Sequence, residues 1–162
     1  MIKIAIVEDE MMYAQQLQDF LHQYEKENGE LFDITVYTDG DQIVHKYQSQ
    51  YDLILMDVEM KFMDGMSAAE EIRKMDTEVV IIFITNMAQY AIRGYAVDAL
   101  DYVLKPSGIL VSDRILYCYL YRKLDQLYLG CGSRDVCTGM VIQYRNDSVE
   151  RRGIDGGILL RK

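Results

Sequence analysis

Five polar side chains of this sequence stand directly after apolar, strand-like stretches. Glu8 and Asp9 follow the stretch IKIAIV, Asp57 follows DLILM, Thr85 follows VVIIFI, and Lys105 follows DYVL. In an open parallel sheet the carboxyl ends of the strands lie at one edge, and ligands bind there. We therefore expect three carboxylates, a hydroxyl and an ammonium to converge on that edge.

Three carboxylates in one place require a cation, because they raise one another's pKa unless positive charge neutralises them. Mg²⁺ commonly takes one or two protein carboxylates, waters and phosphate oxygens, so we expect Asp9 and Asp57 as direct ligands with Glu8 in support. An aspartate can also attack phosphorus and form an acyl phosphate, while a metal and a fixed cation offset charge on the phosphoryl oxygens. Asp57 is the candidate nucleophile, with Lys105 as the cation and Thr85 as a hydrogen-bond donor.

Each residue alone has an ordinary structural explanation. Aspartates often follow strands because they favour turns and cap helices, so Asp9 or Asp57 alone would more often be a cap than a nucleophile. A single Thr or Lys at a strand end carries no information. The coincidence at four strand ends favours the reactive site.

The elements that would position these residues can be predicted from apolar spacing. Strands are expected at 2–7, 33–37, 52–56, 79–84 and 101–104. Between and after them, apolar residues recur at helical spacings of three and four. These residues are Leu17, Leu21 and Tyr24; Ile43 and Tyr47; Ala68, Ile72 and Met75; Ala88, Ile92 and Tyr95; and Leu116, Leu120, Leu124 and Leu127. This alternation predicts an α/β fold, a doubly wound five-stranded parallel sheet with helices on both faces. NG at 28–29 and DG at 39–40 and 64–65 are turn signals in the gaps.

Composition favours one globular domain with a short extension. The 162 residues are 50% hydrophobic, which suffices for one core. No apolar run reaches the roughly 20 residues that cross a bilayer, and no signal-peptide pattern opens the chain, so we expect a cytoplasmic protein without membrane contact. The cysteines Cys118, Cys131 and Cys137 are interpreted as reduced thiols.

Charge divides the chain near Pro106. The net charge of −9 is the balance of −12 over residues 1–106 and +3 over residues 107–162. The acidic first segment argues against nucleic-acid binding there, because phosphate neutralisation needs clustered Lys and Arg. Four arginines near the end of the chain are interpreted as a solvated basic extension rather than a nucleic-acid contact. They are Arg145, Arg151, Arg152 and Arg161.

The stretches IAIVEDE, LILMDVEMKFMDGM, VVIIFITN and DALDYVLKP resemble the receiver domain of two-component response regulators. The resemblance covers residues 1–130. NMAQYAIRGY and GYAVDALDYVLKP are most similar to receivers of LytTR-type regulators. The resemblance implies a flavodoxin-like sheet of order 2-1-3-4-5.

The family also implies a role for each matching residue. Asp57 would be the phosphoacceptor for a sensor histidine kinase. Asp9, Asp57 and the main-chain carbonyl of Glu59 would bind Mg²⁺, and Glu8 would act through a water. Such a protein is a signalling phosphoacceptor and not an enzyme with a separate substrate.

Thr85 and Lys105 would hold the phosphoryl group, and Thr85 and Tyr102 would form the switch. Phosphorylation would then bias a surface of the fourth helix, fifth strand and fifth helix, through which a homodimer is possible. The resemblance also implies a cis bond between Lys105 and Pro106.

Some positions depart from the family pattern. Lys61 and Phe62 replace the usual Pro-Gly-like residues after the acceptor, and Asn86 stands where a small residue is usual. Glu59 and Met87 flank the path of attacking water in the family, and we expect them to tune the phosphoryl lifetime.

The tail matches the family less well. Residues 112–129 predict the last receiver helix, and residues 131–162 are expected to be a short C-terminal extension, a truncated or frame-shifted remnant of an output domain. DNA would be a partner only if the native protein has a full output domain.

An enzymatic alternative is a Mg²⁺-dependent phosphohydrolase with an aspartate nucleophile. Such enzymes carry a second aspartate two residues after the nucleophile, and this chain has Glu59 there. Neither the P-loop nor the dinucleotide-binding glycine pattern occurs, so the sequence gives even less support to a nucleotide-binding fold.

Overall fold

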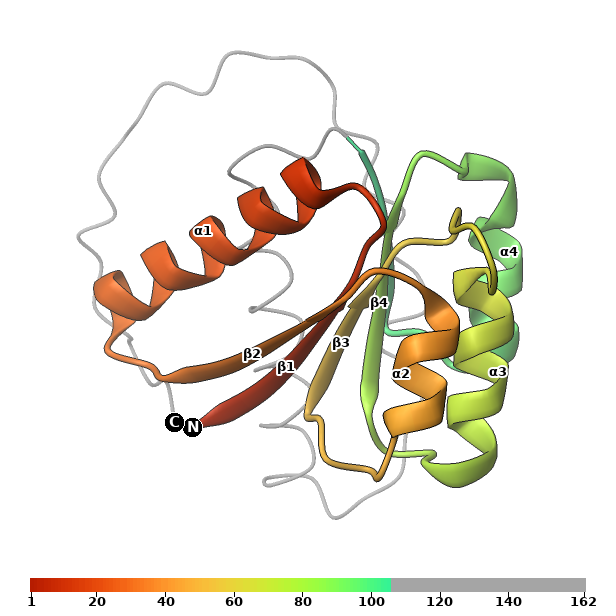
Figure 1. Cartoon of the computed structure of the whole chain (residues 1–162), viewed down its shortest axis with the longest axis horizontal. Coiled ribbons are helices and arrows are strands. Elements are labelled where there is room, and N and C mark those ends of the chain that lie inside the picture. The colour runs from red at the N-terminus through yellow and green to blue at the C-terminus, as the bar shows by residue number, and fades with distance from the viewer. Residues whose placement is uncertain (106–162) are drawn as a thin grey trace, which may run out of the picture. The chain divides into compact units, whose positions relative to one another are not determined.

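A computed structural model of the chain describes residues 1–105, which form a parallel sheet with helices on both faces (Figure 1). The five strands are β1 (Ile2–Val7), β2 (Phe32–Tyr37), β3 (Leu53–Met56), β4 (Val80–Thr85) and β5 (Asp101–Leu104). Their order is β2-β1-β3-β4-β5, and every neighbouring pair is parallel. The predicted doubly wound α/β fold of order 2-1-3-4-5 is confirmed.

Within residues 1–105, one helix lies on one face of the sheet and the other helices lie on the opposite face. The helices are α1 (Met11–Asn28), α2 (Gly40–Lys46), α3 (Gly65–Met75) and α4 (Ala91–Gly94), and single 3₁₀ turns flank α4 at Ala88–Tyr90 and Tyr95–Val97. Figure 1 shows α1 on one face and α2, α3 and α4 on the other.

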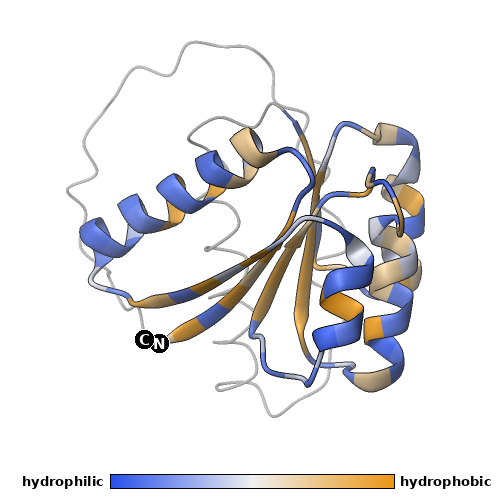
Figure 2. Ribbon diagram, viewed as in Figure 1, coloured by the Kyte–Doolittle hydropathy of each residue, from blue (hydrophilic) through white to orange (hydrophobic). Residues whose placement is uncertain are grey.

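The central strands are apolar throughout because both of their faces are covered. Every residue of β3 and β4 is buried, and Figure 2 shows both strands in the hydrophobic colour. Alternate side chains point to opposite faces. Ile54 and Phe83 thus pack in the cluster with α2 and α3, whereas Leu55 and Ile82 pack in the cluster with α1.

The two DG pairs begin helices, which is more specific than the turns that the sequence predicted. Asp39 accepts a hydrogen bond from the amide of Asp41, and Asp64 accepts one from the amide of Ser67, so each aspartate is an N-cap. The NG pair ends α1, where Gly29 adopts the left-handed conformation with φ of 71°.

The predicted helix with its apolar stripe at Ala88, Ile92 and Tyr95 is wrong in register. The side chains of Ile92 and Tyr95 are 81% and 63% exposed, and the residues that this segment buries are Gly94 and Val97. The helix α4 is only one turn long between two 3₁₀ turns. The second of these turns ends at Val97, and the residue that follows it, Asp98, has a positive φ of 49°. Apolar spacing therefore indicated a helix here but identified the wrong face.

A smaller correction applies to α3. Apolar spacing predicts Met75 in the buried stripe of this helix, but its side chain is 53% exposed at the last helical position. Ala68 and Ile72 are fully buried, as predicted. The predictions for 112–129, for the extension 131–162, for the three cysteines and for the bond to Pro106 lie outside the described residues.

Candidate functional site

The three predicted carboxylates lie together at the carboxyl edge of the sheet. Glu8, Asp9 and Asp57 each offer an oxygen within 4.8 Å of the others. They meet because β1 and β3 are neighbours with Val7 opposite Met56, so the residues that follow these strands emerge side by side. Glu8 is 2% exposed and Asp57 is 6% exposed, so both charges are largely removed from water.

Lys105 follows β5 and reaches carboxylates that follow β3 and β1, so β4 lies between it and Asp57, and β4 and β3 lie between it and Glu8. Its Nζ donates to Glu8 Oε2 at 2.6 Å and to Asp57 Oδ2 at 2.7 Å, and its side chain is 5% exposed. The main-chain amide of Lys105 donates to the carbonyl of Thr85 at 2.9 Å, which fixes the start of the side chain. A buried ammonium thus links two buried carboxylates.

Burial and pairing act in opposite directions on these groups. Burial raises the pKa of Glu8 to about 7, although the hydrogen bond and the charge of Lys105 act to lower it. Burial alone would lower the pKa of Lys105, but its hydrogen bonds to Asp57 and Glu8 outweigh burial, and its pKa is raised. Lys105 is therefore charged at neutral pH, whereas Glu8 exchanges its proton close to neutrality.

A pH dependence of stability follows from Glu8. Because its pKa rises from 4.5 to about 7 on folding, the folded protein keeps a proton that the unfolded chain has lost, and stability falls as pH rises through this window. We expect the free energy of unfolding of the Glu8→Gln variant to change less with pH between these two values than that of the wild type. Denaturant unfolding in EDTA across this range measures it, and equal slopes for the two proteins would refute the assignment.

Thr85 and Tyr102 each form a hydrogen bond with the main chain of Met87. Thr85 is fully buried, and its Oγ1 accepts a hydrogen bond from the Met87 amide at 3.3 Å. The Tyr102 hydroxyl donates to the Met87 carbonyl at 2.5 Å, and its ring lies 5.8 Å from the ring of Phe83. Both predicted switch residues therefore converge on one peptide segment after β4. No hydrogen bond between Thr85 and Asp57 is found within residues 1–105.

The loop after Asp57 contributes a main-chain donor to the site. The amide of Glu59 donates to Asp57 Oδ1 at 3.2 Å, while the Glu59 side chain is exposed. Gly65 at the start of α3 lies so close that a Cβ there would stand 2.0 Å from the Asp57 carbonyl oxygen. Phe62 in the same loop is 86% exposed.

Asp39 anchors this loop, a role that the sequence did not reveal. It is 3% exposed, and its carboxylate accepts hydrogen bonds from the amides of Phe62 and Met63, both at 2.9 Å. Burial would raise the pKa of Asp39, but these amides outweigh burial and lower it. Its position in a DG pair was the available signal, but that signal indicates a cap and not a bond to a loop about 23 residues away.

Replacing Asp39 with Asn is expected to destabilise the protein by about 1–3 kcal/mol. The Asn side chain has a single acceptor oxygen and no negative charge, so it cannot accept hydrogen bonds from the loop amides as both carboxylate oxygens of Asp39 do. Because the pKa of Asp39 is lowered in the folded protein, this stabilisation is fully present at pH values above the ordinary pKa of Asp. It is lost as pH falls through the pKa that Asp39 has in the folded protein. Urea unfolding at neutral and acidic pH measures the difference. The exposed Asp33 provides the control variant Asp33→Asn, and an equal loss in both variants would contradict the anchoring role.

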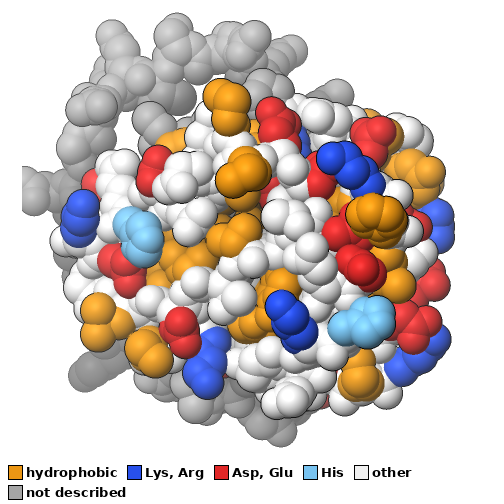
Figure 3. Space-filling view, in the orientation of Figure 1, with side chains coloured by type: hydrophobic (Ala, Val, Ile, Leu, Met, Phe, Trp, Pro, Cys, Tyr) orange, Lys and Arg blue, Asp and Glu red, His pale blue; other side chains and the backbone are white. Residues whose placement is uncertain are grey.

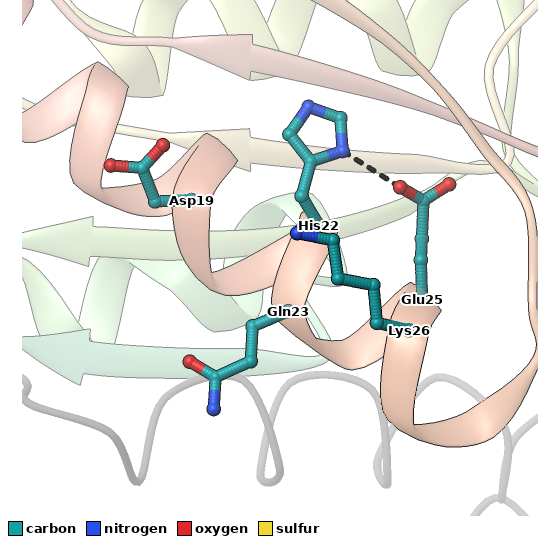
Figure 4. Close-up of a pocket in the computed structure, with 5 residues that line it drawn as sticks. All are labelled: Asp19, His22, Gln23, Glu25 and Lys26. Carbon is teal, nitrogen blue, oxygen red and sulfur yellow. Dashed lines mark hydrogen bonds and ion pairs between the residues drawn. The ribbon is translucent and has the colours of Figure 1, made fainter.

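A pocket elsewhere on the surface is formed by α1 alone. Figure 4 shows its lining side chains, which are Asp19, His22, Gln23, Glu25 and Lys26. His22 Nδ1 lies 2.7 Å from Glu25 Oε2, and this hydrogen bond, with one from the Phe32 amide, lowers the pKa of Glu25. Since Glu25 joins the end of α1 to the start of β2, its contacts serve the fold.

The surface shows no concentration of one charge on the face drawn in Figure 3, where basic side chains are scattered among acidic and apolar ones. Within residues 1–105, no helix combines the length and the apolar character that a membrane span requires.

Comparison with protein families gives the class to which this fold and site belong. The response regulator receiver domain matches residues 4–111. The chain therefore belongs to the response regulator receiver family, which is a signalling family.

Among individual proteins, the chain is similar to regulators of the LytT and LytR type. It is 32% identical to the sensory transduction protein LytT of Bacillus cereus and 28% identical to the sensory transduction protein LytR of Streptococcus agalactiae, each over 106 residues. Each alignment covers 65% of this chain and 42% of the relative, so the chain spans less than half the length of these regulators. The predicted resemblance to LytTR-type receivers is confirmed.

A solved structure with the same fold is that of the response regulator TrrA from Thermotoga maritima in complex with Mg²⁺ and BeF. The match has a TM-score of 0.62 and 26% identity, and it covers 73% of this chain and 99% of that one.

Proposed function

We propose that Asp57 accepts a phosphoryl group from a sensor histidine kinase with the help of Mg²⁺, and that phosphorylation changes the conformation of the domain. The observation that carries this proposal is the buried ion pair of Lys105 with Asp57 and Glu8, at 2.7 and 2.6 Å. A buried carboxylate with a charged lysine and two further acids beside it is costly for stability alone, which favours a functional reason for its presence.

The donor atoms fit a magnesium ion. Three carboxylate oxygens within 4.8 Å of one another are hard ligands of the kind that Mg²⁺ prefers. Asp9 and Asp57 would hold the ion directly, with the main-chain carbonyl of Glu59, and Glu8 would act through a water. The ion would neutralise the carboxylates and the incoming phosphoryl oxygens.

In the transfer, a carboxylate oxygen of Asp57 forms a bond to phosphorus, and the bond from phosphorus to the donor's leaving atom breaks, with its electron pair going to that atom. Lys105 holds Asp57 Oδ2 before transfer and offers the same ammonium to a phosphoryl oxygen afterwards. The Thr85 hydroxyl would exchange its contact with Met87 for another phosphoryl oxygen.

The switch would follow from that exchange. Thr85 and Tyr102 share Met87 as a hydrogen-bond partner, so movement of the Thr85 hydroxyl disturbs the segment that also holds the Tyr102 ring. Ile92, Tyr95 and Leu104 are exposed apolar residues of α4, the following turn and β5, and they would form the surface that responds, including any homodimer contact. A receiver over 1–130 and an extension over 131–162 belong to the same proposal, as does control of transcription through a DNA-binding output domain in a longer native protein.

Incubation with acetyl phosphate and Mg²⁺ tests the proposal against the phosphohydrolase alternative. A receiver gains one phosphoryl group per chain and then releases it slowly. A hydrolase instead turns over many equivalents of small phosphate esters, for which the exposed side chain of Glu59 would have to act as the acid and base. Absence of labelling together with sustained turnover would overturn the proposal.

A further inference from the structure

The ring of Tyr13 contacts the ammonium of Lys105 at the candidate site. Lys105 Nζ lies 4.3 Å from the centroid of the Tyr13 ring. The two other cation–π contacts found in residues 1–105 are longer, at 5.5 Å for Arg93 over Tyr90 and 5.7 Å for Lys46 over Tyr37. The contact in the site is thus the closest of the three.

The Tyr13 ring adds an aromatic contact to the two carboxylate contacts of the Lys105 ammonium. Lys105 has three N–H groups, and two of them donate to Glu8 and Asp57. The Tyr13 ring lies against the same ammonium, whose side chain is only 5% exposed, so little water reaches it. A cation–π contact strengthens when the cation is desolvated.

The fold holds Tyr13 in this place. Tyr13 lies in the first turn of α1, where its amide donates to the carbonyl of Glu10 at 2.9 Å, and its side chain packs at the edge of the core cluster beneath α1. The ring therefore approaches Lys105 from α1, while the carboxylates approach from β1 and β3. The negative face of the ring attracts the ammonium, while two of its N–H groups donate to carboxylate oxygens on Glu8 and Asp57.

We propose that Tyr13 is a positioning residue for phosphoryl transfer, which holds the Lys105 ammonium with the face of its ring so that its N–H groups point at Asp57 and at the arriving phosphoryl oxygens. This inference rests on the proposed function, because it assigns Tyr13 a part in the labelling of Asp57.

The test compares the rates at which acetyl phosphate labels Asp57 in Tyr13→Phe, Tyr13→Leu and Tyr13→Met, measured by intact mass at saturating Mg²⁺. Removing the π face with Leu or Met is expected to slow labelling about fivefold, while Phe keeps the face and stays within about twofold of wild type. Phe20→Leu, which removes a partly buried aromatic from the same helix, is the control and should label at the wild-type rate.

A double-mutant cycle with Lys105→Met separates positioning from a general structural effect. If Tyr13 acts through the ammonium, Tyr13→Leu slows labelling in the wild-type background and has little further effect when Lys105 is Met. Equal slowing in both backgrounds, or slowing by Phe as large as by Leu, would overturn the inference while labelling itself persists. Failure of the wild-type chain to label would overturn the proposed function and this inference with it.

Discussion

The Lys105→Met variant is expected to label at least tenfold more slowly with acetyl phosphate than the wild type and yet to bind Mg²⁺ more tightly. The ammonium donates to Asp57 Oδ2 and to Glu8 Oε2, so its loss removes the fixed cation that transfer requires. The same loss leaves two buried carboxylates unneutralised, which lowers stability by about 3 kcal/mol and raises their attraction for a divalent ion.

Three measurements on Lys105→Met check this result: the labelling rate, Mg²⁺ affinity by calorimetry, and denaturant unfolding with and without Mg²⁺. Mg²⁺ should restore part of the lost stability because it binds the folded state. Lys46→Met serves as the control, since Lys46 is exposed on α2 and contacts the Tyr37 ring. Weaker Mg²⁺ binding by Lys105→Met would show that Lys105 does not compete for the charge of these carboxylates.

Replacement of Gly65 with Ala is expected to cost about 2–4 kcal/mol of stability and to slow labelling of Asp57. The added Cβ would stand 2.0 Å from the Asp57 carbonyl oxygen and 3.1 Å from Met56 Cγ, so the backbone that carries Asp57 has to move. Gly65 also donates its amide to the carbonyl of Val58 at 3.0 Å, which keeps α3 close to this strand end.

Gly94 offers a matched control for that substitution. It is also buried in a helix, but a Cβ there would meet Tyr102 Cδ2 at 3.4 Å, an ordinary contact. Gly94→Ala should therefore leave stability within about 1 kcal/mol of wild type, since Ala also has the higher helix propensity. Urea unfolding and the labelling rate of both variants test the difference, and equal losses would contradict the tight approach of α3 to Asp57.

Much of the site could be predicted from the sequence because strand ends position residues in a regular way. Glu8 and Asp57 follow neighbouring parallel strands, and the position of each along the chain was enough to bring them together. Lys105 was expected at the same edge, but its simultaneous bonds to both carboxylates depend on side-chain reach across β4, which spacing does not specify.

The parts that could not be predicted depend on contacts between distant segments. In the sequence Asp39 is indistinguishable from other turn aspartates, because its hydrogen bonds to the amides of Phe62 and Met63 join segments far apart in the chain. The contact of Tyr13 with Lys105 could not be predicted, because it forms only where α1 approaches the end of β5 in the folded chain. Around α4 the apolar residues Ile92 and Tyr95 are at the surface, where apolar spacing cannot distinguish a core face from an exposed one.

The most direct test of the central claim is the site of phosphoryl attachment. Wild type, Asp57→Asn and Asp52→Asn are incubated with acetyl phosphate and Mg²⁺, and intact mass is followed by peptide mapping. Asp52 precedes the same strand β3 and accepts a bond from the Lys3 amide, so it controls for loss of a carboxylate beside that strand. We predict one phosphoryl group on Asp57 in wild type and in Asp52→Asn, and none in Asp57→Asn. Labelling of Asp57→Asn to the wild-type extent would contradict the account.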